Sequence, residues 1–149
     1  MKLNKMFGII ERCAIDFKNE KLAEVGLSGC NYYYVMSVVR NEGITQDELV
    51  KRICVNKSNV ARNIKYLEDN GFVIRKTDEN DKRINRIYPT QKAIVVFPII
   101  KEVNQEWKSI LLKEFSSEET EELDKLLTKL VSNATNHFNK TYIEEDLWN

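Results

Sequence analysis

Residues 45–93 read TQDELVKRICVNKSNVARNIKYLEDNGFVIRKTDENDKRINRIYPTQKA, and this stretch decides the fold. Thr45 followed by Glu48 is typical of a capping box, in which the two side chains satisfy free N–H groups at the start of a helix. Asn56 is a second N-cap residue, and its helix is expected to end at Gly71, because glycine readily adopts the left-handed conformation. The stretch therefore predicts two capped helices joined by a tight turn.

The pattern changes after the second helix and predicts a β-hairpin. Two short segments with β-branched residues, 72–76 and 83–88, flank the polar turn TDENDK at 77–82. Ile84 and Ile87 fall on opposite faces of an extended strand, so the sequence specifies the register of the second strand only loosely. The hairpin is expected to carry a charged tip.

Amphipathic helices are predicted on both sides of this core. Apolar residues at three- and four-residue steps favour helices over 3–24, 32–39, 91–113 and from Ser116 onward. Thr90 is expected to cap the third of these, and Pro98 to kink it or delay its start. Ser116 with Glu119 forms another capping box. The predicted chain is mostly α, with a small β-hairpin wing.

Length and composition exclude several classes of protein. The 149 residues, 42% hydrophobic and 31% charged, suit one domain with a core that needs no disulfide frame. The apolar run 93–100 is far shorter than the ~20 residues of a membrane span. Since Met1 to Ile10 also lacks the pattern of a signal peptide, we expect a cytoplasmic protein without membrane contact. Three widely spaced cysteines indicate reduced thiols, and a single histidine argues against a metal site.

The formal net charge is zero, but its distribution is uneven. Residues 41–90 carry ten Lys or Arg against eight acidic residues, whereas residues 91–149 carry seven against eleven. A mildly basic middle with an acidic C-terminal third permits contact between the middle segment and nucleic acid.

Two capped helices immediately before a hairpin are the signature of a winged helix-turn-helix, in which the second helix enters a DNA major groove. If one side of that helix faces inward, helical geometry points Ser58, Arg62 and Lys65 the opposite way. Arginine can pair with guanine edges, and lysine with phosphates. An ordinary solvated helix face remains the alternative, as does a merely solubilising role for Lys82 and Arg83 at the hairpin tip.

The stretch resembles the winged-helix core of the MarR-type transcriptional regulators. The motifs that carry the resemblance are Leu67, Gly71 and Phe72 at the end of the recognition helix, Asp81-Lys82-Arg83 in the wing, and Thr90. The resemblance covers nearly the whole chain. It implies a single protomer over 1–149, with a DNA-binding core at 30–90 and dimerisation helices at 1–29 and 91–149.

The resemblance also implies roles for individual residues. Bases would be read by Ser58, Asn59 and Arg62, phosphates held by Lys57 and Lys65, and the minor groove entered by Arg83, beside Lys82. Asp81 would support the wing through an ion pair. Three positions depart from the family's pattern and put the path of the wing in doubt: Pro89 and Asn63 replace apolar residues, and Ala93 replaces a common glycine.

A homodimer is expected both from the resemblance and from the residues. Leu3 to Phe17 and Leu123 to Phe138 present two apolar stripes that one small winged helix cannot bury. The alternative is a monomer that packs these helices on itself.

The family often holds small aromatic or lipophilic effectors between its two parts. Here Tyr32, Tyr33, Met36 and Arg40 are candidate pocket residues, although a run of tyrosines is more often core filling. Cys13 is a candidate redox sensor, because some relatives sense peroxide through an N-terminal cysteine. The alternative is that Cys13 is a small buried filler.

Taken together, the sequence predicts a homodimeric regulator that binds double-stranded DNA, most simply a repressor. A winged helix used only for protein contact is the alternative. We do not expect an enzyme or a cofactor, since the sequence has no glycine-rich phosphate loop and no metal-ligand cluster.

Overall fold

A computed structural model describes residues 1–138 and Lys140 of the chain. The last part of the predicted dimerisation region, from residue 141 onward, lies outside the described residues. The helices are α1 (Leu3–Leu22), the 3-10 turn η1 (Ala23–Val25), α2 (Asn31–Arg40), α3 (Gln46–Ile53), α4 (Lys57–Asp69), α5 (Gln91–Leu111) and α6 (Ser117–His137). The strands are β1 (Ile44–Thr45), β2 (Val73–Thr77) and β3 (Asn85–Pro89). The predicted fold class, mostly helical with a small wing, is confirmed.

The predicted capping residues begin three of the helices. Glu48 N donates to the Thr45 hydroxyl at 3.2 Å, and Thr45 N donates to the Glu48 carboxylate at 2.8 Å. Asn56 accepts from the backbone N–H of Asn59 at 2.8 Å at the start of α4. The capping box at the start of α6 is present as well. These bonds join residues within one helical turn, which explains why local sequence reveals them.

The sheet has a third strand that the sequence did not reveal. The antiparallel order is β1-β3-β2, and the two-residue strand β1 pairs Ile44 with Ile87. The second hairpin strand begins at Asn85, two residues later than predicted. The reason lies in the turn, where Asp78 N donates to the Ile84 carbonyl at 2.8 Å, so that Ile84 belongs to the turn.

Helix α2 lies at the centre of the molecule. It contacts α3, α4, α5 and β3, and its residues from Asn31 to Val38, except Tyr33, are buried. The core around it takes side chains from every strand and from each helix except α6, including Leu22, Leu49, Ile64, Leu67, Phe72, Val73, Ile87 and Ile100. The short winged-helix elements are therefore held on one central helix.

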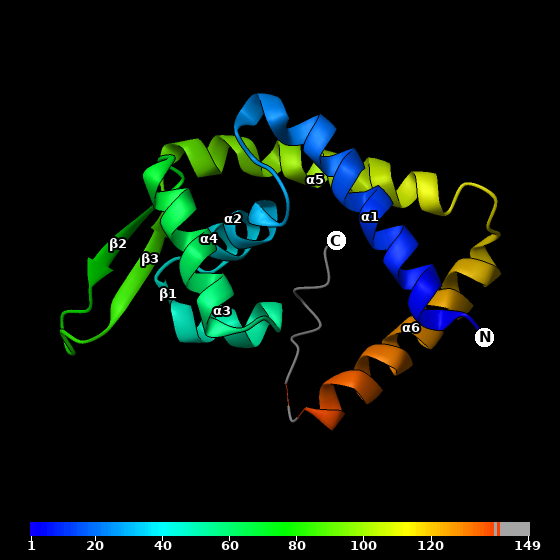
Figure 1. The fold of residues 1–149 in the computed structure, drawn as a ribbon. Coiled ribbons are helices and arrows are strands. Elements are labelled where there is room, and N and C mark those ends of the chain that lie inside the picture. Colours follow the sequence, from blue (N-terminus) through cyan, green and yellow to red (C-terminus); the bar gives the residue numbers. More distant parts are fainter. Residues whose placement is uncertain (139, 141–149) are drawn as a thin grey trace.

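Helices α1 and α5 cross on one side of the winged helix, and α6 folds back so that its C-terminal end comes towards α3 (Figure 1). Phe17 packs against Trp107 with ring centroids 5.3 Å apart, and Lys21 forms an ion pair with Glu106 at 2.8 Å. Helix α5 begins at Gln91 and continues through Pro98, so of the two effects predicted for this proline, a kink or a late start, the late start is wrong. Its buried residues on both sides of Pro98 keep the helix packed on the core.

Thr90 occupies the N-cap position of α5, but its side chain does not cap that helix. Its hydroxyl donates instead to the carbonyls of Gly71 at 2.6 Å and Phe72 at 3.1 Å. Gly71 has φ +76°, the left-handed conformation expected where α4 ends. Thr90 thus connects the end of the wing to the end of the recognition helix, which the sequence pattern alone did not reveal.

Candidate DNA-binding surface

Helix α4 has two faces of opposite character. Val60, Ile64 and Leu67 are fully buried and fix the helix on the core. Ser58, Arg62 and Lys65 are exposed on the other side, as helical geometry predicted. The hydrogen-bonding side chains of α4 are therefore directed away from the core.

A hydrogen-bond network orders the first turns of α4. The Ser58 hydroxyl donates to the Asn56 side chain at 2.8 Å, and Arg62 Nη2 donates to Asn59 Oδ1 at 2.8 Å. Asn63 Nδ2 donates to the Asn59 carbonyl at 2.9 Å and to Asn59 Oδ1 at 3.1 Å. Asn63, polar where the family usually has an apolar residue, is thereby satisfied, and the oxygen of Asn59 is already engaged. In the free protein, Asn59 orients Arg62.

The two lysines assigned to phosphates are held by weak surface ion pairs. Lys57 Nζ lies 2.9 Å from Asp47, and Lys65 Nζ lies 3.0 Å from Asp69, with both lysine side chains at least 70% exposed. Exposed pairs of this kind contribute about 0–1 kcal/mol. A phosphate can therefore replace the carboxylate partner at little cost in free energy.

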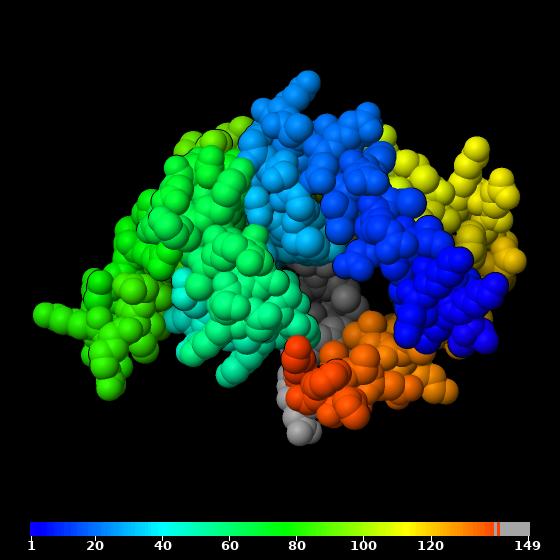
Figure 2. Space-filling model, viewed as in Figure 1, coloured from blue at the N-terminus to red at the C-terminus, as the bar shows by residue number. Residues whose placement is uncertain are grey.

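The wing carries Lys82 and Arg83 at its tip. Arg83 has a 91% exposed side chain, and its guanidinium donates to both carboxylate oxygens of Asp81, from Nε at 3.0 Å and Nη2 at 2.9 Å. Lys82 is also exposed. The hydrogen bonds from Arg83 hold the pKa of Asp81 below its usual value. The hairpin projects from the body at the end opposite to α6 (Figure 2).

Sequence reasoning missed the residues that anchor this hairpin. Arg86 on β3 donates through Nε to the Asp78 carboxylate and through Nη1 to the Gly43 carbonyl at 2.9 Å. Asp78 also accepts from the backbone N–H groups of Asn80 at 2.8 Å and Asp81 at 3.0 Å. Hydrogen bonding to Arg86 holds the pKa of Asp78 below its usual value. In the sequence, the acidic residue Asp78, three positions before Asp81, is the only sign of this anchor.

The predicted pocket residues separate into two groups. Tyr32 and Tyr33 line a pocket of about 370 Å³ between α1 and the start of α2, and Tyr33 also lines a second pocket of about 860 Å³. Met36 and Arg40 line neither of these pockets. Met36 is 1% exposed and belongs to the core, where Asn104 contacts its sulfur at 3.4 Å, and Arg40 lies over the Phe97 ring. The four positions fall within about 100° of the circumference of α2, so it is the packing of neighbouring elements, and not helical periodicity, that separates them.

The second pocket reaches the recognition helix. Its walls include Asn59 and Arg62 of α4 and, on the opposite side, Val131 and Thr135 of α6. A molecule in this pocket would therefore lie beside two of the residues assigned to base reading.

The three thiols are free. Cys13, the candidate redox residue, is exposed on α1, so the alternative that it fills a buried gap is wrong. Over residues 1–138 and 140, no group of His, Cys, Asp and Glu side chains could hold a metal ion. Among the helices of these same residues, none is both long and apolar enough for a membrane span.

Comparison with known proteins identifies the family. The model of the MarR family matches residues 32–84. A Bacillus subtilis protein named as the uncharacterized HTH-type transcriptional regulator YybA is 32% identical over 126 residues, which cover 85% of this chain and 84% of the relative. The chain belongs to the MarR family. It is accordingly a winged-helix transcriptional regulator that binds DNA.

Solved MarR-family structures share the fold over nearly the full length. The transcriptional regulator SlyA is 32% identical with a TM-score of 0.89, and the match covers 93% of this chain and 98% of that one. A MarR-family regulator from Listeria monocytogenes, solved in complex with a 26mer DNA, is 28% identical with a TM-score of 0.85. That match covers 92% of this chain and 91% of the other. The protein-contact alternative is not favoured by these relatives.

Proposed function

We propose that this MarR-family chain is a sequence-specific repressor that acts as a homodimer on a pseudo-palindromic operator in the cytoplasm of a prokaryotic cell. Residues 30–90 form its DNA-binding core, and 1–29 with 91–149 its dimerisation helices. It works by binding, without catalysis and without a cofactor. A dimer that covers promoter DNA excludes other proteins from it, and therefore we expect repression.

One observation carries the DNA-reading part of the proposal. Helix α4 is fixed by three fully buried residues, while Ser58 and Arg62 stay exposed on its outer face and Arg83 stands 91% exposed on the adjacent wing. Serine and arginine at the start of a helix in the major groove read base edges, and an arginine on a wing suits a narrow minor groove. Lys57, Lys65 and Lys82 add phosphate contacts, and Asn59 positions Arg62.

The dimer is supported by the apolar surface that one protomer leaves open. Helix α6 has no buried residue, and large apolar side chains are exposed on α1, at the end of α5 and on α6, including Met6, Phe7, Ile10, Ile110, Leu126 and Leu130. Apolar patches of this size on a soluble protein mark an interaction surface. Two-fold symmetry would place the two α4 helices about 34 Å apart, one turn of DNA.

Release by a small aromatic or lipophilic effector is supported by the pocket beside α4. A ligand there contacts Asn59 and Arg62 directly, and would disturb the network that orders them. Oxidation of the exposed Cys13 is a second route to release. Replacing Cys13 by serine would abolish any loss of DNA binding caused by peroxide, whereas an unchanged peroxide response would exclude this route.

Fluorescence anisotropy tests the DNA proposal. Labelled DNA from upstream of the chain's own gene is titrated at low and physiological salt, beside a scrambled duplex. We expect binding that prefers the upstream DNA, falls steeply with salt because counterions are released, and is weakened about tenfold in each of Arg62→Ala and Arg83→Ala. Lys108→Ala removes one exposed charge from α5, far along the chain from α4, and serves as the matched control. Binding unchanged in both arginine variants would indicate a protein-contact role instead.

A further inference from the structure

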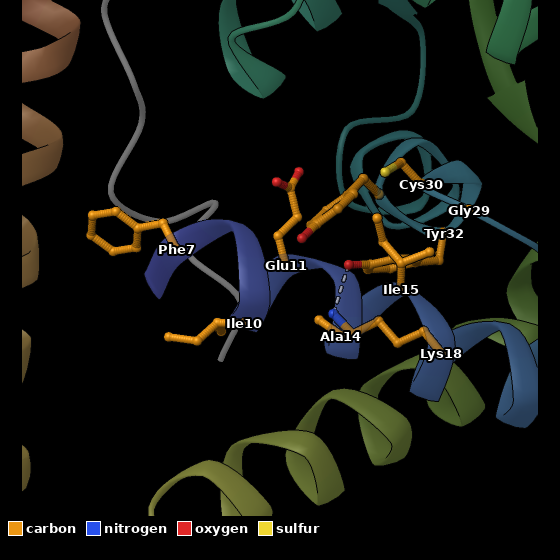
Figure 3. Close-up of a pocket in the computed structure, with 10 residues that line it drawn as sticks. Phe7, Ile10, Glu11, Ala14, Ile15, Lys18, Gly29, Cys30 and Tyr32 are labelled. Atoms are coloured by element: carbon orange, nitrogen blue, oxygen red, sulfur yellow. Dashed lines mark hydrogen bonds between the residues drawn. The ribbon is translucent and has the colours of Figure 1, made fainter. Parts of the chain in front are cut away.

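Lys18 is a basic residue in an unusual environment. Its side chain is buried, 8% exposed, and it lines the pocket of about 370 Å³ between α1 and the start of α2. The pocket's volume falls within the range of about 300–1,000 Å³ typical of small-molecule sites. Figure 3 shows Lys18 at the inner end of the pocket, with its amine directed at Tyr32.

The surroundings of the amine are aromatic and apolar. Lys18 Nζ donates to the Tyr32 hydroxyl at 2.6 Å and lies 4.4 Å from the centroid of the Tyr32 ring and 5.6 Å from that of Tyr33. The remaining walls include Phe7 and Ile10. Among the described residues, no carboxylate forms an ion pair with Lys18, whereas Lys21, one turn later on the same helix, is paired with Glu106.

Burial without a carboxylate partner changes the chemistry of an amine. Desolvation disfavours the charged form and lowers the pKa of Lys18 to about 8, so about a tenth of the side chain is the neutral, nucleophilic amine at pH 7, far more than for an exposed lysine. This minor neutral fraction can act as a nucleophile towards a carbonyl carbon.

We infer that this pocket takes a small aromatic aldehyde, which Lys18 binds covalently as an imine. The aldehyde ring packs against the apolar walls and the Tyr32 and Tyr33 rings, and its carbonyl carbon meets the Lys18 amine. The inference concerns ligand chemistry at this pocket and does not depend on DNA binding.

The step balances without any co-reactant. Lys18 Nζ attacks the carbonyl carbon, a C–N bond forms, and the resulting carbinolamine loses its oxygen as water. The two hydrogens of that water come from the amine. The Tyr32 hydroxyl, 2.6 Å from Lys18 Nζ, is placed to relay a proton from the amine to the departing oxygen.

Reductive trapping tests the inference on the full-length protein. The chain is incubated with an equimolar amount of benzaldehyde and sodium cyanoborohydride, which converts an imine into a stable benzylamine, and is then analysed by intact mass and peptide mapping. We expect one benzyl group per chain, with labelling of Lys18 at least tenfold above the average of the other lysines. Thiol adducts at Cys30 are not trapped by this reduction.

Three variants distinguish the site from general lysine reactivity. Lys18→Arg keeps the positive charge without a nucleophilic amine and is expected to lose the selective label. Lys21→Met, on the same helix, is the matched control and is expected to keep it. Tyr32→Phe is expected to slow labelling several-fold. Two results on the wild-type chain alone would overturn the inference. One is labelling spread evenly over the exposed lysines, and the other is no labelling of Lys18 while other lysines react.

Discussion

Asp81 holds the guanidinium of Arg83 by two hydrogen bonds, at 3.0 Å and 2.9 Å, at the tip of the wing. The same carboxylate accepts from the backbone N–H of Arg83 at 3.0 Å. The residue assigned to the minor groove is therefore oriented, and its charge partly balanced, before DNA arrives. DNA must compete with Asp81 for this side chain.

Replacing Arg83 separates DNA binding from folding. Because its side chain is 91% exposed, we expect Arg83→Ala to change the free energy of unfolding by less than about 0.5 kcal/mol. DNA affinity should fall about tenfold, in line with the ~1–3 kcal/mol of a well-placed arginine contact. Urea denaturation and anisotropy measure the two quantities. Arg83→Lys keeps the charge, but its compact ammonium is more strongly hydrated than a guanidinium and is expected to enter a narrow minor groove less readily, so full recovery of affinity by lysine would contradict this role.

Asp78→Asn tests the anchor of the wing. The pKa of Asp78 is lowered chiefly by the Arg86 hydrogen bond, so the stabilisation is present above the unfolded value of about 3.9 and is lost as pH falls through the folded value. We expect the variant to bind DNA more weakly at neutral pH and to show faster proteolysis within 78–84. The difference in stability from the wild type should vanish in strong acid. If the free energies of unfolding of the variant and the wild type differ by the same amount at pH 7 and pH 2, the Asp78–Arg86 ion pair does not contribute to stability.

Asn56→Ala tests the cap of the recognition helix. The Asn56 side chain accepts from Asn59 N and from the Ser58 hydroxyl, both at 2.8 Å. Loss of an N-cap costs about 1 kcal/mol, which we expect in urea denaturation. DNA affinity should fall as well, because the first turn of α4 loses its order. Asn56→Asp keeps the acceptor and should restore the stability.

Leu126→Glu tests the dimer. The Leu126 side chain is 52% exposed on α6 in the protomer, and a carboxylate there would be buried by a partner. We expect sedimentation velocity to show monomers for Leu126→Glu and dimers for the wild type. Ile74→Glu, at a 42% exposed position on β2, is the matched control and should remain dimeric. A monomeric wild type would refute the dimer.

Lys18 predicts an unusual dependence of stability on pH. The unfolded chain keeps the Lys18 proton up to about pH 10.5, whereas the folded chain releases it above about pH 8. The free energy of unfolding therefore rises with pH between these values. We expect Lys18→Met to be more stable than the wild type at pH 7, by roughly 1–3 kcal/mol at 1.36 kcal/mol per pKa unit. The stability advantage of Lys18→Met over the wild type should narrow by pH 10. If urea denaturation gives the same advantage at pH 7 and pH 10, this explanation is wrong.

Much of the fold could be predicted because its signals are local. The caps at Thr45, Asn56 and Ser116 involve side chains and backbone groups only three residues apart. The inner face of α4 follows from helical periodicity alone. The same periodicity directed Arg62 outward, and the polar turn before β3 placed Arg83 at the wing tip. For the candidate DNA surface, the residue list therefore came directly from the sequence.

Other features could not be predicted from these patterns. Strand β1 is two residues long, too short for any alternation to be visible. The base-reading role that the resemblance implies for Asn59 stays a prediction, and only the structure shows that its oxygen accepts from Arg62 and Asn63 in the free protein. Met36 shares a helix with Tyr32 and Tyr33 but is buried in the core.

The sequence by itself determined the order of the α-helices and the hairpin, their boundaries within a few residues and the exposed side of the recognition helix, since each depends on residues one helical turn or one hairpin apart. Only the tertiary structure decided how Arg86 anchors the wing to Gly43, 43 residues away, and how Lys18 of α1 meets Tyr32 of α2. The physical reason is that burial and the pKa shift it causes depend on which distant segments surround a side chain. The lowered pKa of the Lys18 amine therefore results from the packing of α1 against α2.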